Sequence, residues 1–272
     1  MAVSADELED YAVHLAAGAA DVVRGADPRS GGSQRDLDVQ AKSTASDLVT
    51  VVDRMSERWL IEQIARDRPG DALLGEEGGP REGTTGVRWL LDPIDGTVNF
   101  VLGLPQYAIS VAAQLDGRVV AGAVCNPVSG ELFHARQGGG AWLGEQALSG
   151  PREVELSRAV IGTGFGYDRE LRRRQAAVAA ALLPRIADLR RLGSAALDLC
   201  ALAAGRLDGY FEAGLNPWDY GAGALIATEA GCVVSGLHGD AVSSRITVGA
   251  GVALAPELVA VLEELGADRV AD

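Results

Sequence analysis

Apolar residues recur at helical spacing near the start of the chain. Between residues 5 and 23 they stand three or four positions apart, which predicts an amphipathic helix. The turn-rich stretch 25–46 follows and predicts a mobile loop or a short hairpin. A second long helix is expected to begin at Ser46 or Asp47, either of which can cap it, and to end near Asp67.

Short apolar segments dominate the middle of the chain. Two of them flank Asp116-Gly117, a dipeptide typical of a two-residue hairpin turn. A glycine-rich loop is expected over residues 78–86. The predicted strands cover residues 72–75, 87–91, 107–115, 119–125, 131–135 and 141–143. These short strands predict a mostly antiparallel sheet.

Strands and helices alternate after residue 150. The predicted strands cover residues 160–164, 188–192, 209–212, 232–234 and 246–249, and the predicted helices cover 168–183, 194–204, 218–230 and a last segment from Pro256. This alternation is typical of α/β layering. Because Gly150-Pro151 marks the change of pattern, we expect an N-terminal α+β half over 1–150 and a C-terminal α/β half over 151–272.

Composition narrows the classes of partner and compartment. The chain has 272 residues, of which 47% are hydrophobic, so it can bury a large core. Its net charge of −14 argues against direct binding to a nucleic-acid backbone. No signal-peptide pattern and no apolar run of membrane-spanning length stands in the sequence. The dispersed Cys125, Cys200 and Cys232 predict buried free thiols, so we expect a cytoplasmic protein without membrane contact.

The segment 89–100 carries the strongest chemical signal. An apolar strand delivers Asp92 at its end, the proline after it is expected to stop the strand, and Asp95 precedes the start of a short helix. Backbone N–H groups of Gly96 and Thr97 would be free there to bind an anion such as phosphate. Two carboxylates brought so close repel unless a proton or a cation lies between them, and Mg²⁺ prefers such oxygen ligands.

The Asp-x-x-Asp spacing alone carries little weight. In an acidic chain such a pair occurs by chance, and Asp95 can also serve as a helix N-cap. Three further acidic segments strengthen the signal: Gly75-Glu76-Glu77-Gly78 follows an apolar strand, Asp219 lies at the start of a predicted helix, and Asp53 lies near the start of another.

Together these segments resemble the inositol monophosphatase family of lithium-sensitive, Mg²⁺-dependent phosphatases. The resemblance rests on GEEG at 75–78, DPIDGT at 92–97 and WDYGAGALIATEAG from Trp218, in the family's order and over nearly the whole chain. It implies a layered α/β sandwich of the α+β type, with α/β/α/β/α layers and the metal ions between its two halves. It also implies a homodimer.

The resemblance implies two to three Mg²⁺ ions per active site. Glu76, Asp92 and the backbone carbonyl of Ile94 would hold the first ion. Asp92, Asp95 and Asp219 would hold the second, and Glu76 with water molecules would hold a weaker third. One ion would lower the pKa of the attacking water, and another would stabilise the leaving oxygen.

The resemblance also implies roles for other residues. Thr97, hydrogen-bonded to Asp53, would orient and help to deprotonate the attacking water. Lys42, the one lysine among 24 basic residues, would approach the phosphate or a metal-bound water. The implied catalytic residues are Glu76, Asp95, Thr97 and Asp53. The implied substrate-binding residues are Gly96, Thr97, Gly193, Ser194, Ala195, Glu212, Asp219 and Lys42.

The substrate expected from this resemblance is inositol monophosphate, a small phosphorylated polyol. Glu212 and the residues Val98-Asn99-Phe100 after the DPIDGT motif resemble inositol-phosphate members of the family. Histidinol phosphate, fructose 1,6-bisphosphate and 3′-phosphoadenosine 5′-phosphate remain open as alternatives with the same mechanism. A dual role as a protein that binds the transcription machinery also remains open.

Overall fold

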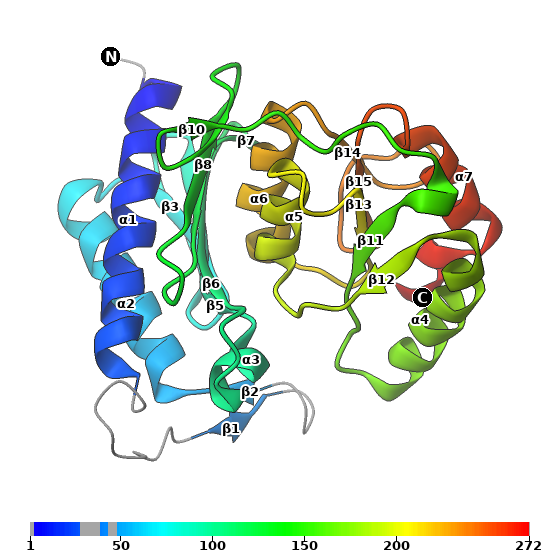
Figure 1. Cartoon of the computed structure of the whole chain (residues 1–272). Helices are drawn as coiled ribbons and strands as arrows, with labels where there is room; N and C mark the ends of the chain where they lie inside the picture. Colours follow the sequence, from blue (N-terminus) through cyan, green and yellow to red (C-terminus); the bar gives the residue numbers. More distant parts are fainter. Residues whose placement is uncertain (1–2, 28–38, 43–47, 272) are drawn as a thin grey trace.

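The computed structural model describes residues 3–27, 39–42 and 48–271, and its main feature is a pair of β-sheets with helices between and outside them (Figure 1). The first sheet has eight strands in the order β10-β9-β8-β7-β6-β5-β3-β4. All of its neighbouring strands are antiparallel except β3 and β5, which are parallel. Its strands are β3 (Ala72–Gly75), β4 (Gly79–Arg81), β5 (Val87–Asp95), β6 (Ala108–Leu115), β7 (Arg118–Cys125), β8 (Leu132–Arg136), β9 (Ala141–Leu143) and β10 (Gln146–Ala147).

Helices α1 (Ala5–Ala26) and α2 (Val51–Asp67) cover one face of this sheet. The α1 residues Leu8 and Leu15 are fully buried in one core cluster with Trp89 and Ile109 of the sheet. Their spacing places them on one side of the helix, which is the physical reason for the amphipathic pattern in the sequence. Short strands β1 (Gln40–Ala41) and β2 (Leu48–Val49) pair antiparallel, and β2 occupies residues that the sequence predicted to be helical.

Helices α5 (Ala195–Ala203) and α6 (Pro217–Glu229) cover the other face of the eight-stranded sheet. Phe133 and Leu90 of the sheet share a buried cluster with Cys200 of α5 and Ile226 of α6. The same two helices contact strands of the second sheet on their far side. They therefore form a middle layer between the two sheets (Figure 1).

The second sheet has five strands in the order β12-β11-β13-β15-β14. Strands β12, β11 and β13 run parallel, and β15 and β14 complete the sheet in antiparallel pairs. The strands are β11 (Val160–Thr163), β12 (Asp188–Arg190), β13 (Gly209–Glu212), β14 (Val233–Ser235) and β15 (Thr247–Ala250). The outer helices are α4 (Arg169–Leu182) and α7 (Ala255–Glu264), and the short 3₁₀ helices are η2 (Leu156–Arg158), η3 (Leu183–Arg185) and η4 (Ala267–Ala271).

These elements stack as α/β/α/β/α layers, which confirms the predicted layered fold of the α+β type. The division of the chain at residue 150 stays a prediction, since α5 and α6 bury their side chains against strands from before residue 150. No helix within the described ranges is long and apolar enough to cross a membrane. Cys125, Cys200 and Cys232 are buried free thiols, as the sequence predicts.

Two details of the sequence prediction were wrong. Helix α2 is capped by Thr50, whose hydroxyl accepts hydrogen bonds from Val52 and Asp53, while Ser46 and Asp47 lie outside the described residues. The residues 79–81, expected in a loop, form the edge strand β4 against β3. The second error has a clear physical cause: the backbone of residues 79–81 satisfies its hydrogen bonds by pairing with β3, which the composition of the segment does not show.

The third difference concerns the strand before the acidic motif. Strand β5 continues to Asp95 through a β-bulge, because its pairing shifts between Asp92 opposite Ser110 and Asp95 opposite Ala108. A bulge tolerates proline, since the extra residues need no ladder hydrogen bond. The expectation that Pro93 stops the strand was therefore wrong, and the bulge is what brings both aspartates to one side.

Candidate active site

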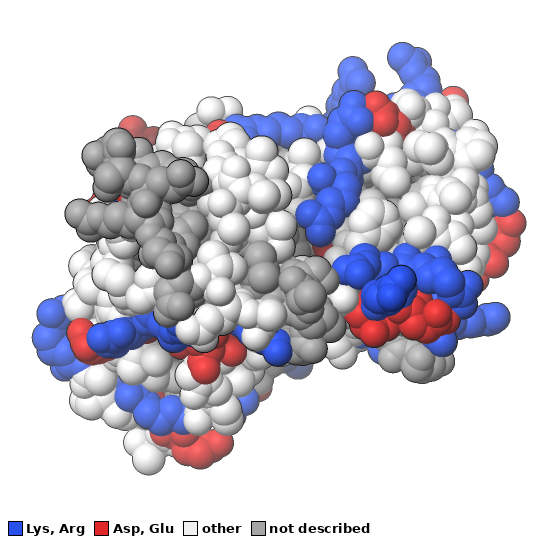
Figure 2. Space-filling view, turned by 90° about the horizontal axis from the view of Figure 1, so that it is seen from below, with Lys and Arg blue, Asp and Glu red and all other residues white. Residues whose placement is uncertain are grey.

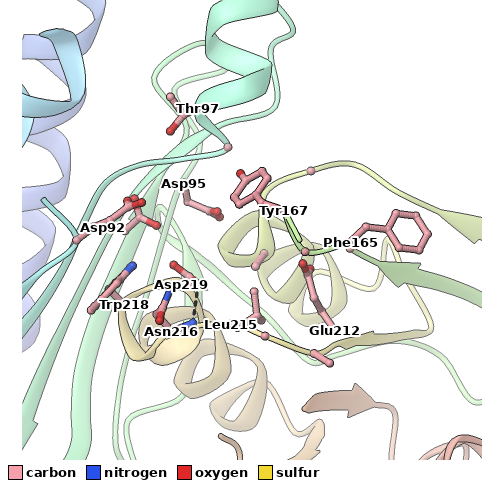
Figure 3. A pocket seen from close by; sticks show the side chains of 18 of the residues that line it. Asp92, Asp95, Thr97, Phe165, Tyr167, Glu212, Leu215, Asn216, Trp218 and Asp219 are labelled. Atoms are coloured by element: carbon pink, nitrogen blue, oxygen red, sulfur yellow. Dashed lines mark hydrogen bonds between the residues drawn. The ribbon is translucent and has the colours of Figure 1, made fainter. Parts of the chain in front are cut away.

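A cavity of about 430 Å³ opens at the end of the eight-stranded sheet, against α5, α6 and β13. Figure 3 shows its side chains converging from these separate elements. The acidic members among the lining residues are Glu76, Asp92, Asp95, Asp168, Glu212 and Asp219. The candidate metal ligands of the sequence therefore line one cavity. Glu76 and Asp219 meet there although most strands of both sheets lie between them in the sequence.

The parallel pairing of β3 with β5 brings the first two carboxylates together. Gly75, the last residue of β3, lies opposite Leu91, so that Glu76 and Asp92 follow at the same edge of the sheet. The backbone N–H of Glu76 donates to the Leu91 carbonyl at 3.2 Å. Asp92 is buried, and its Oδ1 accepts a 3.1 Å hydrogen bond from the Ile94 N–H across the bulge.

Asp95 is held from the opposite side by the start of α5. Its Oδ2 accepts hydrogen bonds from the Ser194 hydroxyl, at 2.5 Å, and from the Ala196 N–H, at 2.7 Å. Ser194 also caps α5 by accepting from the Leu197 N–H. A carboxylate at a helix N-terminus is stabilised by the free N–H groups and the helix dipole. This contact ties the bulge of β5 to the second half of the chain.

Asp219 lies in the first turn of α6. Its Oδ2 accepts a 2.7 Å hydrogen bond from the Asn216 N–H, which closes a capping box at the helix start. The neighbouring Trp218 is anchored through its carbonyl, which accepts from the Ser110 hydroxyl at 3.1 Å. The capping contact fixes Asp219 in the cavity that Asp92 also lines (Figure 3).

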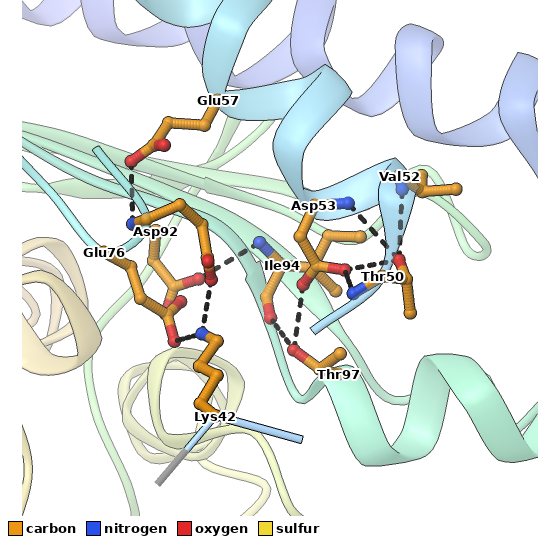
Figure 4. Close-up of polar contacts among 10 residues, drawn as sticks. Lys42, Thr50, Val52, Asp53, Glu57, Glu76, Asp92, Ile94 and Thr97 are labelled. Carbon is orange, nitrogen blue, oxygen red and sulfur yellow. Dashed lines mark hydrogen bonds and ion pairs between the residues drawn. The ribbon is translucent and has the colours of Figure 1, made fainter. Parts of the chain in front are cut away.

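Lys42 lies beside the acidic turn after β3 (Figure 4). Its ammonium group is 2.7 Å from Oε1 of Glu76 and also forms an ion pair with Glu77. Glu57 of α2 supports the turn from behind, since its Oε1 accepts from the Glu77 N–H at 3.0 Å. Burial lowers the pKa of Lys42, but the two neighbouring carboxylates outweigh it and raise that pKa, so the lysine is charged at neutral pH.

Thr97 and Asp53 form a buried pair next to these carboxylates. The Thr97 hydroxyl oxygen is 3.0 Å from Oδ1 of Asp53 and 3.1 Å from the Ile94 carbonyl oxygen. Oδ2 of Asp53 accepts from the Thr50 N–H at 2.9 Å and from the Thr50 hydroxyl. Gly96 adopts a left-handed φ of 97° between β5 and α3 (Thr97–Leu102), a turn that a larger side chain would strain.

Burial raises the pKa values of these carboxylates, and for Asp92 and Asp219 the charges of neighbouring carboxylates raise them further. Burial and the charges of Glu76, Asp95 and Asp219 raise the pKa of Asp92 well above its usual range. Burial raises the pKa of Glu76 to about 7 and that of Asp95 to about 6, and burial with the Asp95 charge raises that of Asp219. Such crowding of like charges is relieved by protons or by a cation.

The chemistry of these donors fits a hard divalent cation. Buried carboxylates and a backbone carbonyl are the oxygen ligands that Mg²⁺ prefers. In the part of the chain that the structure describes, no group of three or more His, Cys, Asp or Glu side chains stands in an arrangement that could hold a metal ion. The set of metal ligands thus stays a prediction.

The opposite wall of the cavity carries Glu212 at the end of β13. Its Oε2 accepts a 2.7 Å hydrogen bond from the Tyr210 hydroxyl, and burial raises the pKa of Glu212 to about 7. A Cβ placed on Gly164 would stand 2.0 Å from the Glu212 carboxylate, so this carboxylate packs directly on the glycine backbone. Gly193 and Ala195 line the same wall, whereas Ser194 lies behind them, bonded to Asp95.

Sequence reasoning missed several residues of this site. Glu57 follows Asp53 by four positions, and both face the same side of α2, so buried acidic residues at helical spacing were an available signal. Gly164, Tyr167 and Arg191 line the cavity without any motif that would have singled them out. These residues reach the cavity only through the tertiary fold, which the local sequence does not show.

Comparisons with known proteins agree with this architecture. A model of the inositol monophosphatase family matches residues 4–267. The inositol-1-monophosphatase SuhB of Mycobacterium tuberculosis is 46% identical over 270 residues, which cover 94% of this chain and 93% of that protein. The Nus factor SuhB of Escherichia coli is 41% identical over 197 residues, covering 72% of this chain and 74% of that protein.

A solved structure of Mycobacterium tuberculosis SuhB has the same fold. It superposes with a TM-score of 0.80 at 42% identity and covers 96% of this chain and 97% of that chain. The family match, the identity over nearly the full length and the shared fold agree with one another and with the motifs of the sequence. The chain therefore belongs to the inositol monophosphatase family.

Proposed function

We propose that the protein is a Mg²⁺-dependent phosphomonoesterase that converts inositol monophosphate to myo-inositol and phosphate by attack of an activated water. The observation that carries the proposal is the convergence of Glu76, Asp92, Asp95 and Asp219 on one cavity, beside the buried pair of Thr97 and Asp53. Family membership supports the phosphatase class.

The proposed sets of metal ligands are those that the family resemblance implies. Glu76, Asp92 and the Ile94 carbonyl would hold one Mg²⁺ ion, Asp92, Asp95 and Asp219 a second, and Glu76 with water a third. When bound, these ions supply a water of lowered pKa and neutralise charge on the phosphate and the leaving oxygen. No side chain of this mechanism becomes phosphorylated.

The remaining steps belong to the chain's own groups. The Thr97 hydroxyl orients the attacking water and passes a proton toward Asp53, whose other oxygen is held by Thr50. Burial raises the pKa of Asp53, which makes it a better proton acceptor than an exposed aspartate. The N–H groups of Gly96 and Thr97 bind phosphate oxygens at the start of α3, and Lys42 adds a positive charge beside them.

The alcohol part of the substrate is proposed to lie against the other wall. The segment Gly193-Ser194-Ala195 and the Glu212 carboxyl group offer hydrogen bonds to ring hydroxyls. Glu212 is held for this role by Tyr210 on one side and by the Gly164 backbone on the other. A carboxyl group fixed at two points discriminates between hydroxyl positions better than a mobile one.

Phosphate release by the purified protein, with and without Mg²⁺, tests the proposal. The substrates are myo-inositol 1-phosphate, histidinol phosphate, fructose 1,6-bisphosphate and 3′-phosphoadenosine 5′-phosphate. A Mg²⁺-dependent preference for the inositol ester is expected. Preference for another ester would keep the mechanism and overturn the substrate, and no release from any ester by folded protein would overturn the enzyme class.

Variants of the ligands test the mechanism in the same assay. Asp95→Asn and Glu76→Gln are expected to abolish phosphate release without unfolding the protein. Asp188→Asn is the matched control, because this carboxylate pairs with Arg190 outside the cavity. Near-normal activity of either ligand variant would contradict the metal assignment.

The name of the Escherichia coli relative favours a second candidate role, in transcription. That relative is a Nus factor, and 72% of this chain aligns with it. We propose that binding to the transcription machinery can coexist with catalysis. Co-purification with RNA polymerase that survives Asp95→Asn would support this role, and absence of co-purification under conditions that retain known factors would contradict it.

The proposal also includes the oligomeric state of the protein and its compartment in the cell. We propose a homodimer in the cytoplasm, where the three buried thiols stay reduced. Light scattering coupled to gel filtration measures the mass directly. A mass near twice the 28.2 kDa of one chain is expected, and a monomer would contradict the dimer.

A further inference from the structure

Arg191 stands on the rim of the cavity, in the connection between β12 and α5. One of its guanidinium nitrogens, Nη1, lies 2.4 Å from the point that a Cβ on Gly193 would occupy. Gly193 has no side chain and adopts a left-handed φ of 95°. The guanidinium group therefore folds over the glycine, beside the segment that borders Asp95.

Arg191 forms no direct polar contact within the described residues, although its charge acts on nearby carboxylates. Of the described residues that line the cavity, two are basic, Lys42 and Arg191. Lys42 already pairs with Glu76 and Glu77. Neither a hydrogen bond nor an ion pair to a described residue engages Arg191, while its neighbour Arg190 pairs with Asp188. An unpaired guanidinium at the mouth of an acidic cavity is available to a ligand.

The two basic residues act at different sides of the cavity. The charge of Lys42 lowers the pKa values of Glu76 and Glu57, at the turn after β3. On the wall assigned to the alcohol, burial raises the pKa of Glu212 and the charge of Arg191 opposes that rise. Glu212 has a pKa of about 7, so it is partly protonated at neutral pH and repels a nearby anion less than an ordinary carboxylate.

We propose that Arg191 binds a second phosphate group on the alcohol part of an ester, and so favours the bisphosphate over the monophosphate of the same alcohol. This inference rests on the proposed phosphatase function. A planar guanidinium presents paired N–H donors that match two phosphate oxygens, and such charge-assisted bonds are stronger than bonds between neutral groups. The first phosphate lies at the metal ligands, and the retained one lies at Arg191.

A pair of substrates that differ by one group tests the proposal. Fructose 1-phosphate and fructose 1,6-bisphosphate share the ester at carbon 1 and differ in the phosphate at carbon 6. Steady-state kinetics are measured for the wild type, Arg191→Gln and Arg191→Lys. The matched control is Arg190→Gln, which removes the same charge one residue away, from a side chain that does not line this cavity.

The expected result is selective. Arg191→Gln lowers kcat/KM for cleavage of the bisphosphate at carbon 1 by about tenfold, mainly through KM, and leaves the monophosphate unchanged. Arg191→Lys keeps the charge but loses the paired donors, so its kcat/KM for the bisphosphate lies between those of the wild type and Arg191→Gln. Arg190→Gln changes kcat/KM for neither substrate. Equal losses on both substrates would place Arg191 at the transferred phosphate and overturn the proposal. No loss on either substrate would also overturn it.

Calorimetric binding of fructose 6-phosphate, the product that retains the second phosphate, tests the Arg191 site independently of the phosphatase activity. About tenfold weaker binding to Arg191→Gln than to Arg190→Gln would support the Arg191 site even if the protein hydrolysed neither ester, in which case the proposed function fails alone. Equal binding to both variants by an enzyme that is active on fructose 1-phosphate would overturn the Arg191 site and leave the proposed function standing.

Discussion

The Thr97 hydroxyl oxygen lies 3.0 Å from Oδ1 of Asp53, although 44 positions separate the two residues in the chain. The contact joins the start of α3, where Thr97 lines the cavity, to the first turn of α2 (Figure 4). Asp53 cannot turn away easily, because Thr50 holds its other carboxylate oxygen. The proton acceptor of the proposed mechanism is therefore fixed before the substrate arrives.

Replacement of Thr97 by valine tests this relay. The side chains have nearly the same shape, so the variant loses the hydroxyl and keeps the packing. We expect kcat to fall about a hundredfold or more with little change in KM, as for loss of a general acid–base group. Thr228→Val is the control, because the Thr228 hydroxyl donates to the Ala224 carbonyl on an exposed part of α6. An unchanged kcat would remove Thr97 from the mechanism.

Replacement of Lys42 by glutamine tests its ion pairs. The Lys42 ammonium competes with a metal ion for Glu76 and offers a charge to the phosphate. We expect the Mg²⁺ concentration for half-maximal activity to fall and the KM for the substrate to rise, each about two- to fivefold. Mg²⁺ titrations of activity at fixed substrate measure the first effect. A rise in the Mg²⁺ requirement would show that Lys42 supports the ion instead of competing with it.

Replacement of Gly164 by alanine tests how Glu212 is held. The added methyl group would stand 2.0 Å from the Glu212 carboxylate, which must then move. We expect KM for inositol monophosphate to rise about as much as in Glu212→Gln, with no further rise in the double variant, since both changes disturb one contact. Gly25→Ala near the end of α1, with open space around the site of its Cβ, is the control. Additive effects would contradict the shared role.

The buried carboxyl group of Asp198 on α5 should make the free energy of unfolding depend on pH. This carboxyl group is buried, neither oxygen has a hydrogen-bond partner among the described residues, and burial raises its pKa well above the usual value. The folded state therefore holds the proton more tightly than the unfolded state. Between the unfolded and the folded pKa, stability is lost as pH rises, by about 1.4 kcal/mol for each unit that separates the two values.

Asp198→Asn removes this pH-dependent loss. Urea unfolding at pH 5 and pH 8 should show a gain in unfolding free energy for the variant that is larger at pH 8. Asp188→Asn is the control, since the Arg190 side chain lowers the pKa of Asp188 and its loss should give no gain at pH 8. An equal effect of Asp198→Asn at both pH values would mean that the carboxyl group stays neutral throughout or finds a partner.

The acidic motifs could be predicted from the sequence because their chemistry is local. Asp92, Asp95 and the residues after them carry a spacing and an order that the family shares, and they lie at the cavity as expected. The helix starts at Ser194 and Asn216 could also be predicted, since both residues are of types that favour the N-cap position.

The contacts that position those motifs could not be predicted. Pro93 suggested an end to β5, yet the pairing of Asp95 with Ala108 continues the strand after a bulge. The packing of Glu212 on Gly164 and the fold of Arg191 over Gly193 depend on distances between segments that meet only in the folded chain. Local propensity carries no information about such neighbours.

The middle layer of α5 and α6 has a consequence for any attempt to divide the protein. A chain ended at residue 150 would keep Glu76, Asp92 and Asp95, but would expose the sheet face that contains Leu90 and Phe133 to water. Exposed apolar faces of this kind lead to self-association. Such a fragment should therefore aggregate instead of forming a stable half, so that translation must pass α6 before a stable molecule with a complete cavity can exist.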